Sequence, residues 1–145
     1  MNGFLLDTNV PSELAHSRPD ENVRSWFTAQ PAASLYLSVI TIGELRRGFA
    51  LLPAGKRRAD LERWFERSLT PAFQGRILPV TQAIAERWGV IDASAKSRGI
   101  AVKIADGLIA ATAIEHGLTL ATRNVRDFVQ WPVKLHNPWP ESGRS

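Results

Sequence analysis

The sequence predicts an α/β fold in which a parallel sheet of four to five short strands is covered by helices on both faces. Short apolar runs alternate with longer segments whose apolar residues recur at helical spacing. No hairpin turn separates two apolar runs, and the connections between them are short. Alternation of this kind is typical of strand–helix–strand units that build a parallel sheet.

Composition limits the class of protein. With 145 residues, 44% of them hydrophobic, we expect one domain over residues 1–140 and a frayed tail at 141–145. The absence of cysteine excludes thiol catalysis, disulfides and Cys-ligated zinc, and favours an intracellular protein. No apolar run approaches about 20 residues, and Met1 leads directly into a strand, so we expect no membrane span, no signal peptide and a cytoplasmic location. A net charge of +4 suits a polyanionic partner.

The first third of the chain predicts two strands and three helices. Residues 4–6 form a first, central strand that ends at Asp7, and a short helix follows over 10–15. A second helix begins near Asp20 and ends before Pro31; its Trp26 and Phe27 are expected in the core, as is the 51–52 end of the third helix. The second strand covers 35–37, and Ser38 caps the third helix, over 39–51.

The remaining two thirds alternate in the same way. A long amphipathic helix is expected over 56–73, a third strand over 76–80 and a helix capped by Thr81 that runs to Arg98. The inner stripe of the long helix is predicted to be Leu61, Trp64, Phe65, Ser68 and Leu69. Residues 104–114 are apolar or small on almost every side, which indicates a buried helix that ends at Gly117 in a left-handed cap. A fourth strand over 118–122 and an edge strand over 133–136 complete the sheet.

Four polar residues are predicted to meet at one edge of this sheet. Asp7 ends the first strand, Glu44 lies on the helix after the second, Asp106 begins the buried helix, and Asn124 follows the fourth strand. Ligands of open parallel sheets bind beyond the carboxyl ends of the strands. Taken singly, each residue also has a structural explanation, such as a turn at Asp7 or a solvated helix face at Glu44.

Three converging carboxylates would repel one another unless a cation separated them. Oxygen ligands without Cys or suitably spaced His favour Mg²⁺, or Mn²⁺, over zinc. The chemistry expected of such a site is metal-assisted hydrolysis of a phosphodiester. The three histidines have no neighbouring nucleophile, and neither a phosphate-binding glycine loop nor a dinucleotide fingerprint is present.

The ordered motifs LLDTNV (5–10), SVITIGELRRG (38–48), IADGLIAATA (104–113) and LTLATRN (118–124) resemble those of the PIN-domain ribonuclease toxins of the VapC family. AGK (54–56), GRILPV (75–80) and HNPW (136–139) are similar to its FitB-like branch. The resemblance implies a three-layer PIN-like fold, an Mg²⁺-dependent endoribonuclease and a homodimer. It further implies a cognate VapB/FitA-like antitoxin, through which the complex binds promoter DNA.

Carried over by position, the resemblance makes Asp7, Glu44 and Asp106 the catalytic and metal-binding acids. Thr8 and Asn124 would supply supporting polar contacts. Asn124 stands where the family often has a fourth acid, which puts a second metal ion in doubt, and Asp127 lies one helical turn later.

Two alternatives remain open from the sequence. The first is a PIN-fold protein that has lost cleavage and acts with its antitoxin as a DNA-binding repressor, which the amide of Asn124 favours. The second is a phosphatase of the haloacid dehalogenase type, because LLDTNV resembles the nucleophile loop of that class. Such a loop has a second acid where this chain has Asn9.

Overall fold

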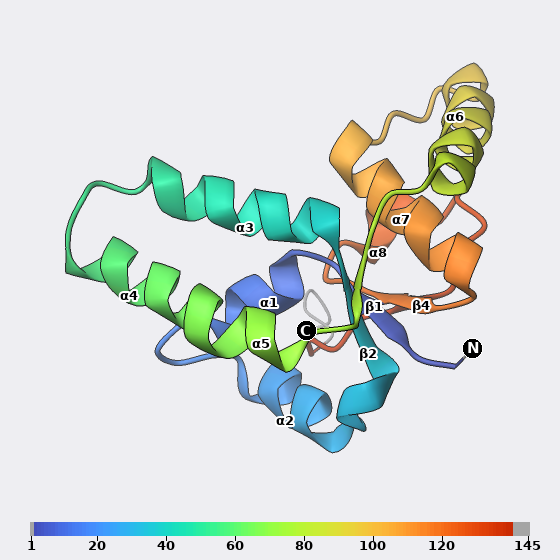
Figure 1. The fold of residues 1–145 in the computed structure, drawn as a ribbon. Helices are drawn as coiled ribbons and strands as arrows, with labels where there is room; N and C mark the ends of the chain where they lie inside the picture. The colour runs from blue at the N-terminus through green and yellow to red at the C-terminus, as the bar shows by residue number, and fades with distance from the viewer. Residues whose placement is uncertain (1, 141–145) are drawn as a thin grey trace.

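A five-stranded parallel sheet forms the centre of the molecule, as shown by a computed structural model that describes residues 2–140 (Figure 1). The strand order is β3-β2-β1-β4-β5, and every pairing is parallel. The strands are β1 (Phe4–Leu6), β2 (Leu35–Ser38), β3 (Ile77–Leu78), β4 (Thr119–Ala121) and β5 (Leu135–His136). The chain adds β2 and β3 on one side of β1 and β4 and β5 on the other, so the strand order switches between β1 and β4.

Helices cover both faces of the sheet, which confirms the predicted three-layer arrangement (Figure 1). One group is α1 (Asn9–Leu14), α2 (Glu21–Ala29), α3 (Val39–Leu51), α4 (Lys56–Trp64) and α5 (Thr70–Ala72), with a 3₁₀ turn at Ala32–Ser34 and a π-helical turn, η2, at Phe65–Leu69. The other group is α6 (Gln82–Ser97), α7 (Ile104–His116) and α8 (Val125–Phe128). Each group of helices thus packs on one face of the sheet and forms one of two hydrophobic cores with it.

Neighbouring side chains of each strand enter different cores because strand side chains alternate between the two faces. On β1, Leu6 belongs to the core under α1 to α5, whereas Leu5 belongs to the core under α6 and α7. On β4, Ala121 belongs to the first of these cores and Leu120 to the second. Both faces of the central strands are therefore buried, which explains why they read as uninterrupted apolar runs.

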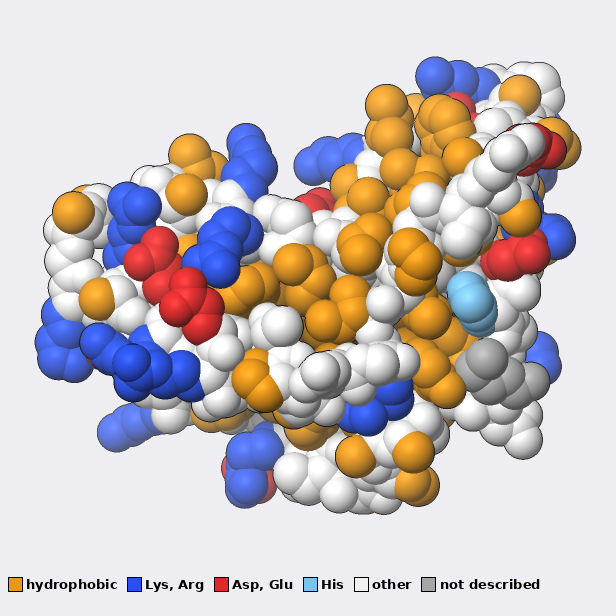
Figure 2. Space-filling view, in the orientation of Figure 1, with side chains coloured by type: hydrophobic (Ala, Val, Ile, Leu, Met, Phe, Trp, Pro, Cys, Tyr) orange, Lys and Arg blue, Asp and Glu red, His pale blue; other side chains and the backbone are white. Residues whose placement is uncertain are grey.

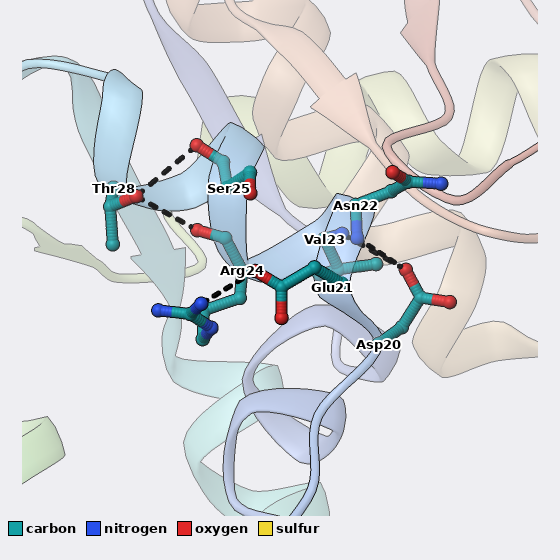
Figure 3. A network of polar contacts seen from close by, with 7 residues as sticks. All are labelled: Asp20, Glu21, Asn22, Val23, Arg24, Ser25 and Thr28. Atoms are coloured by element: carbon teal, nitrogen blue, oxygen red, sulfur yellow. Dashed lines mark hydrogen bonds and ion pairs between the residues drawn. The ribbon is translucent and has the colours of Figure 1, made fainter.

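The helix ends follow local rules. Asp20 caps α2: its Oδ1 accepts hydrogen bonds from the backbone N–H groups of Asn22 and Val23, at 2.9 and 3.1 Å (Figure 3). Gly117 ends α7 with φ 66°, in the left-handed conformation that the sequence predicts. That cap turns the chain directly into β4, and so fixes the strand next to β1.

The long helix differs from its prediction in one turn. Phe65–Leu69 is π-helical, with more residues per turn than an α-helix, so the inward positions there fall four residues apart. Phe65, Leu69 and Phe73 are buried, whereas Ser68, predicted to face inward, is exposed. Leu51 is also exposed rather than in the core, because it lies two residues beyond Phe49, off the helix face whose buried positions are four residues apart.

Trp26 and Phe27 pack against the core as predicted. The strands β3, β4 and β5 are shorter than their apolar runs, and α8 was not predicted. The predicted tail at 141–145 lies outside the described residues.

The first turn of α7 lies very close to α6. A Cβ added at Gly107 would come within 2.8 Å of the Trp88 indole on α6, and within 3.0 Å of Trp131. Only glycine allows this approach, which holds the N-terminal end of α7, and with it Asp106, against the rest of the fold. No helix between residues 2 and 140 is long and apolar enough to cross a membrane.

Candidate active site

The predicted acids lie along one cavity at the carboxyl end of the sheet, where the strand order switches. This acid cavity has a volume of about 640 Å³ and is lined by Asp7, Thr8, Asn9, Ser12, Glu44, Arg47, Lys103, Ala105, Asp106 and Asn124. In the space-filling view, acidic side chains are visible in a recess between α3 and the first turn of α7, with Lys or Arg side chains on both sides (Figure 2).

Asp7 is the most enclosed of the acids, with a relative exposure of 4%. The backbone N–H of Thr8 donates to its Oδ1 at 2.8 Å, and the hydroxyl of Thr122 donates to its Oδ2 at 2.7 Å. Burial, with smaller contributions from the charges of Asp106 and Glu44, nevertheless raises the pKa of Asp7 to about 6 against the effect of the two hydrogen bonds. A carboxylate so placed is poorly solvated and gains from a cation beside it.

Glu44 is tied to the loop after β1. Its Oε1 accepts a hydrogen bond from the Thr8 hydroxyl. The Thr8 and Thr41 hydroxyls lie 3.1 Å apart; since Thr8 has one proton, which goes to the carboxylate, the fully buried Thr41 donates in turn. Two threonines thus fix how Glu44 enters the cavity from α3.

Asp106 enters from the opposite side, in the first turn of α7. Burial and then the charge of Glu44 raise its pKa, Lys103 lowers it, and Asp127 raises it. Three acids from three separate elements therefore share one electrostatic environment.

The donor set fits Mg²⁺ or Mn²⁺: carboxylate, hydroxyl and amide oxygens line the acid cavity, which has no sulfur or imidazole ligand. Residues 2–140 contain no group of three acidic or histidine side chains already arranged to hold an ion. Magnesium retains several of its waters and takes only one or two carboxylates directly, so a set of acids spread around a cavity suits it.

Asn124 and Asp127 occupy different positions relative to the acids. Asn124 is exposed, lines the acid cavity and precedes α8. Asp127, on α8, does not line that cavity; its influence there is through its charge at Asp106. Asp127 thus stands beside the site rather than in it.

Sequence reasoning missed several lining or supporting residues. Arg47 and Lys103 bring positive charge to the acid cavity. Thr122 holds Asp7, and Asn9 donates from Nδ2 to the Thr122 hydroxyl oxygen at 3.3 Å. Thr122 and Asn9 lie inside the motifs LTLATRN and LLDTNV, but their bond joins residues 113 positions apart, which no spacing within one motif indicates.

Comparisons with known proteins agree with this architecture. The model of the PIN domain matches residues 4–131. The chain is 44% identical over 136 residues to VapC ribonuclease Y4jK of Sinorhizobium fredii, covering 94% of this chain and 97% of that protein. Toxin FitB of Neisseria gonorrhoeae is also 44% identical over 136 residues, covering 94% and 98%.

Among solved structures, FitAB bound to an IR36 DNA fragment superimposes with a TM-score of 0.89 at 41% identity, covering 98% of this chain and 99% of that chain. The similarity spans every element from β1 to β5. The chain therefore belongs to the PIN-domain family, in the FitB-like branch of the VapC toxins.

Proposed function

We propose that this protein is the toxin of a type II toxin–antitoxin pair and a metal-dependent endoribonuclease that hydrolyses RNA phosphodiester bonds in the acid cavity. The observation that carries the proposal is the convergence of Asp7, Glu44 and Asp106 from β1, α3 and α7 on one cavity, with Asp7 buried at a pKa of about 6. A relative of 44% identity named as a VapC ribonuclease supports the reaction class.

Each residue has a proposed part in the reaction. Asp7 and Asp106 would hold Mg²⁺, directly or through water, and Glu44 would be a further ligand or the group that orients the attacking water. When bound, Mg²⁺ supplies the positive charge that orients the phosphate, lowers the pKa of a water and offsets charge in the transition state. Arg47 and Lys103, at the same cavity, attract the RNA phosphate.

Supporting contacts position these groups. The Thr8 hydroxyl, held by Thr41, keeps Glu44 directed into the cavity, and Thr122 does the same for Asp7. Asn124 contributes an amide at the rim where the family often has an acid, so we propose catalysis with three acids and Asp127 as an electrostatic neighbour.

An antitoxin site is proposed beside the acid cavity. A groove of about 230 Å³ between α1, α3 and α4 shares Thr8, Ser12 and Glu44 with that cavity. Its other lining is largely apolar: Ala15, Leu45, Phe49, Leu52 and Leu61. An amphipathic segment of a VapB/FitA-like antitoxin would fit such a groove and block the acids at its end. We further propose that this complex binds promoter DNA through the antitoxin, as the DNA-bound FitAB structure suggests.

We also propose a homodimer. Of the five large apolar side chains that are most exposed among residues 2–140, three lie on α6, at the start of α7 and after α8: Val90, Ile104 and Val129. Their exposed fractions, 73%, 63% and 64%, are those of side chains that association would cover. Sedimentation of the purified toxin tests this: a monomer at micromolar concentration contradicts it.

The test of the activity is cleavage of a panel of single-stranded and looped RNAs by protein purified without antitoxin. We expect Mg²⁺-dependent cleavage, abolished by a chelator, and at least a hundredfold loss in Asp106→Asn and Glu44→Gln. Asp92→Asn and Glu86→Gln make the same changes on α6, outside the acid cavity, and should retain wild-type rates. Equal cleavage, or equal absence of it, in wild type and Asp106→Asn would refute the nuclease assignment.

A further inference from the structure

A second polar cavity adjoins the acid cavity, between α8 and the segment that follows β5. Its volume is about 850 Å³, which is larger than that of the acid cavity. Residues of this α8 cavity include Arg123, Asn124, Arg126, His136, Asn137 and Trp139. Asn124 lines both cavities, so they share a wall. The size is that of a site for a small organic group such as a nucleotide.

The α8 cavity is rich in hydrogen-bond donors. Neither Arg123 nor Arg126 forms an ion pair within residues 2–140. The Arg123 guanidinium lies over the Trp139 indole, 5.4 Å from the ring centre, which restricts its conformations. Asn137 uses its Oδ1 to accept from the Trp139 backbone N–H at 2.9 Å, which leaves its NH₂ group to donate.

The net charge of the lining is positive. Burial lowers the pKa of His136, so near neutral pH the positive charge comes from the two arginines. One carboxylate, Asp127, opposes them, and it also interacts with Asp106 across the shared wall. Guanidinium and amide donors around an open cavity are the groups that bind phosphate oxygens.

The shared wall is anchored to the catalytic residues. The Thr122 hydroxyl, which donates to Asp7, accepts a hydrogen bond from the Asn124 backbone N–H at 3.0 Å. The Arg123 backbone N–H donates to Asn9 Oδ1 at 3.4 Å. The backbone of Arg123 is therefore held at a fixed position relative to Asp7, because the neighbouring residue, Thr122, is hydrogen-bonded to Asp7.

Two cavities adjoin the acid cavity, the antitoxin groove and the α8 cavity, and an RNA strand whose scissile phosphate lies in the acid cavity could continue into either. The antitoxin groove is largely apolar and contains one arginine, Arg57. The α8 cavity offers two arginines and amide donors. A polyanion follows the donor-rich path, because an apolar groove cannot replace the hydration of its phosphates.

Resting on the proposed ribonuclease function, we propose that the α8 cavity is the subsite for the nucleotide next to the scissile bond, with Arg123 and Arg126 contacting its backbone phosphate. Asn137 supplies a further donor to the same nucleotide. The arginines act in binding and positioning, so they govern KM and affinity rather than the chemical step.

Affinity for a labelled single-stranded RNA, in an Asp106→Asn background that prevents cleavage, tests the subsite. Arg126→Gln and Arg123→Gln should each weaken binding about tenfold at low salt and reduce the slope of log affinity against log salt by about 0.7. Arg67→Gln removes the same charge from an exposed position that lines neither cavity and should change neither quantity. With Asp106 intact, Arg126→Gln should raise KM and leave kcat within about threefold.

The two proposals fail differently. If wild type cleaves RNA and both cavity variants match Arg67→Gln in affinity and salt slope, the subsite is refuted and the nuclease stands. If the variants lose affinity for the antitoxin but not for RNA, the subsite is likewise refuted, and the cavity belongs to the antitoxin. If wild type neither binds nor cleaves RNA, the proposed function itself fails.

Discussion

Replacing Asp7 by Asn should change how stability depends on pH. In the folded protein the pKa of Asp7 is raised from 3.8 to about 6, chiefly by burial. Protonation of Asp7 therefore stabilises the folded state fully below pH 3.8, and this contribution is lost as the pH rises through about 6. The size of the shift corresponds to about 3 kcal/mol.

The amide introduced by Asp7→Asn carries no charge at any pH, so only the wild type bears this cost of ionisation. The free energy of unfolding of Asp7→Asn minus that of wild type should increase by about 2.4 kcal/mol from about pH 4 to about pH 8, because the unfolded carboxyl is already partly ionised at pH 4. The absolute difference is less informative, because the single amide oxygen can accept only one of the two hydrogen bonds that Asp7 receives, from the Thr8 N–H and the Thr122 hydroxyl.

Urea unfolding of both proteins, with a chelator present and at one protein concentration, measures this difference. The other titrating groups are common to the two proteins, so most of their contributions cancel. A difference that stays constant from acid to neutral pH would show that Asp7 ionises normally in the fold. The electrostatic reason for a cation at this site would then be removed.

Three further substitutions test parts of the structure that support the site. Thr122→Val removes the hydroxyl that orients Asp7 and should lower RNA cleavage by about 10- to 100-fold, with the Asp7 pKa rising further; a pH–rate profile measures both. Gly107→Ala should destabilise the protein by about 1–3 kcal/mol because the methyl group meets an indole at 2.8 Å, whereas Gly89→Ala, with nothing within 4 Å, should be neutral or stabilising. Asp20→Ala removes the cap of α2 and should cost about 1 kcal/mol in thermal unfolding; no change in Tm would mean that α2 does not need the cap.

Most of the fold was predictable because most of its strands and helices have a local signal. Leu5 and Leu6 are both apolar because β1 is buried on both faces, and Gly117 marks the end of α7. The π-helical turn was not predictable. Its one visible effect is that Ser68, which α-helical spacing would place on the buried face, is exposed. The four-residue helix α8 is too short for a periodic pattern.

The site, too, was predictable only where its residues have a local sequence signal. Asp7, Glu44 and Asp106 stand next to strand ends or helix starts, so topology alone brings them to one edge. Thr8 could be predicted from its place beside Asp7. The roles of Thr41 and Thr122 could not, since a buried Thr reads as an ordinary β-former until its partner is known. In the sequence, Arg123 and Arg126 look like ordinary loop residues. They line a cavity only because α8 lies beside the segment after β5.

The central claim, that three acids create one divalent-metal site, is tested most directly by binding of Mn²⁺ to the antitoxin-free protein, followed by electron paramagnetic resonance. Wild type should bind the ion. Asp7→Asn and Asp106→Asn should each weaken binding at least tenfold, whereas Asp92→Asn should bind as wild type does. Equal Mn²⁺ affinity in all four proteins would contradict the site.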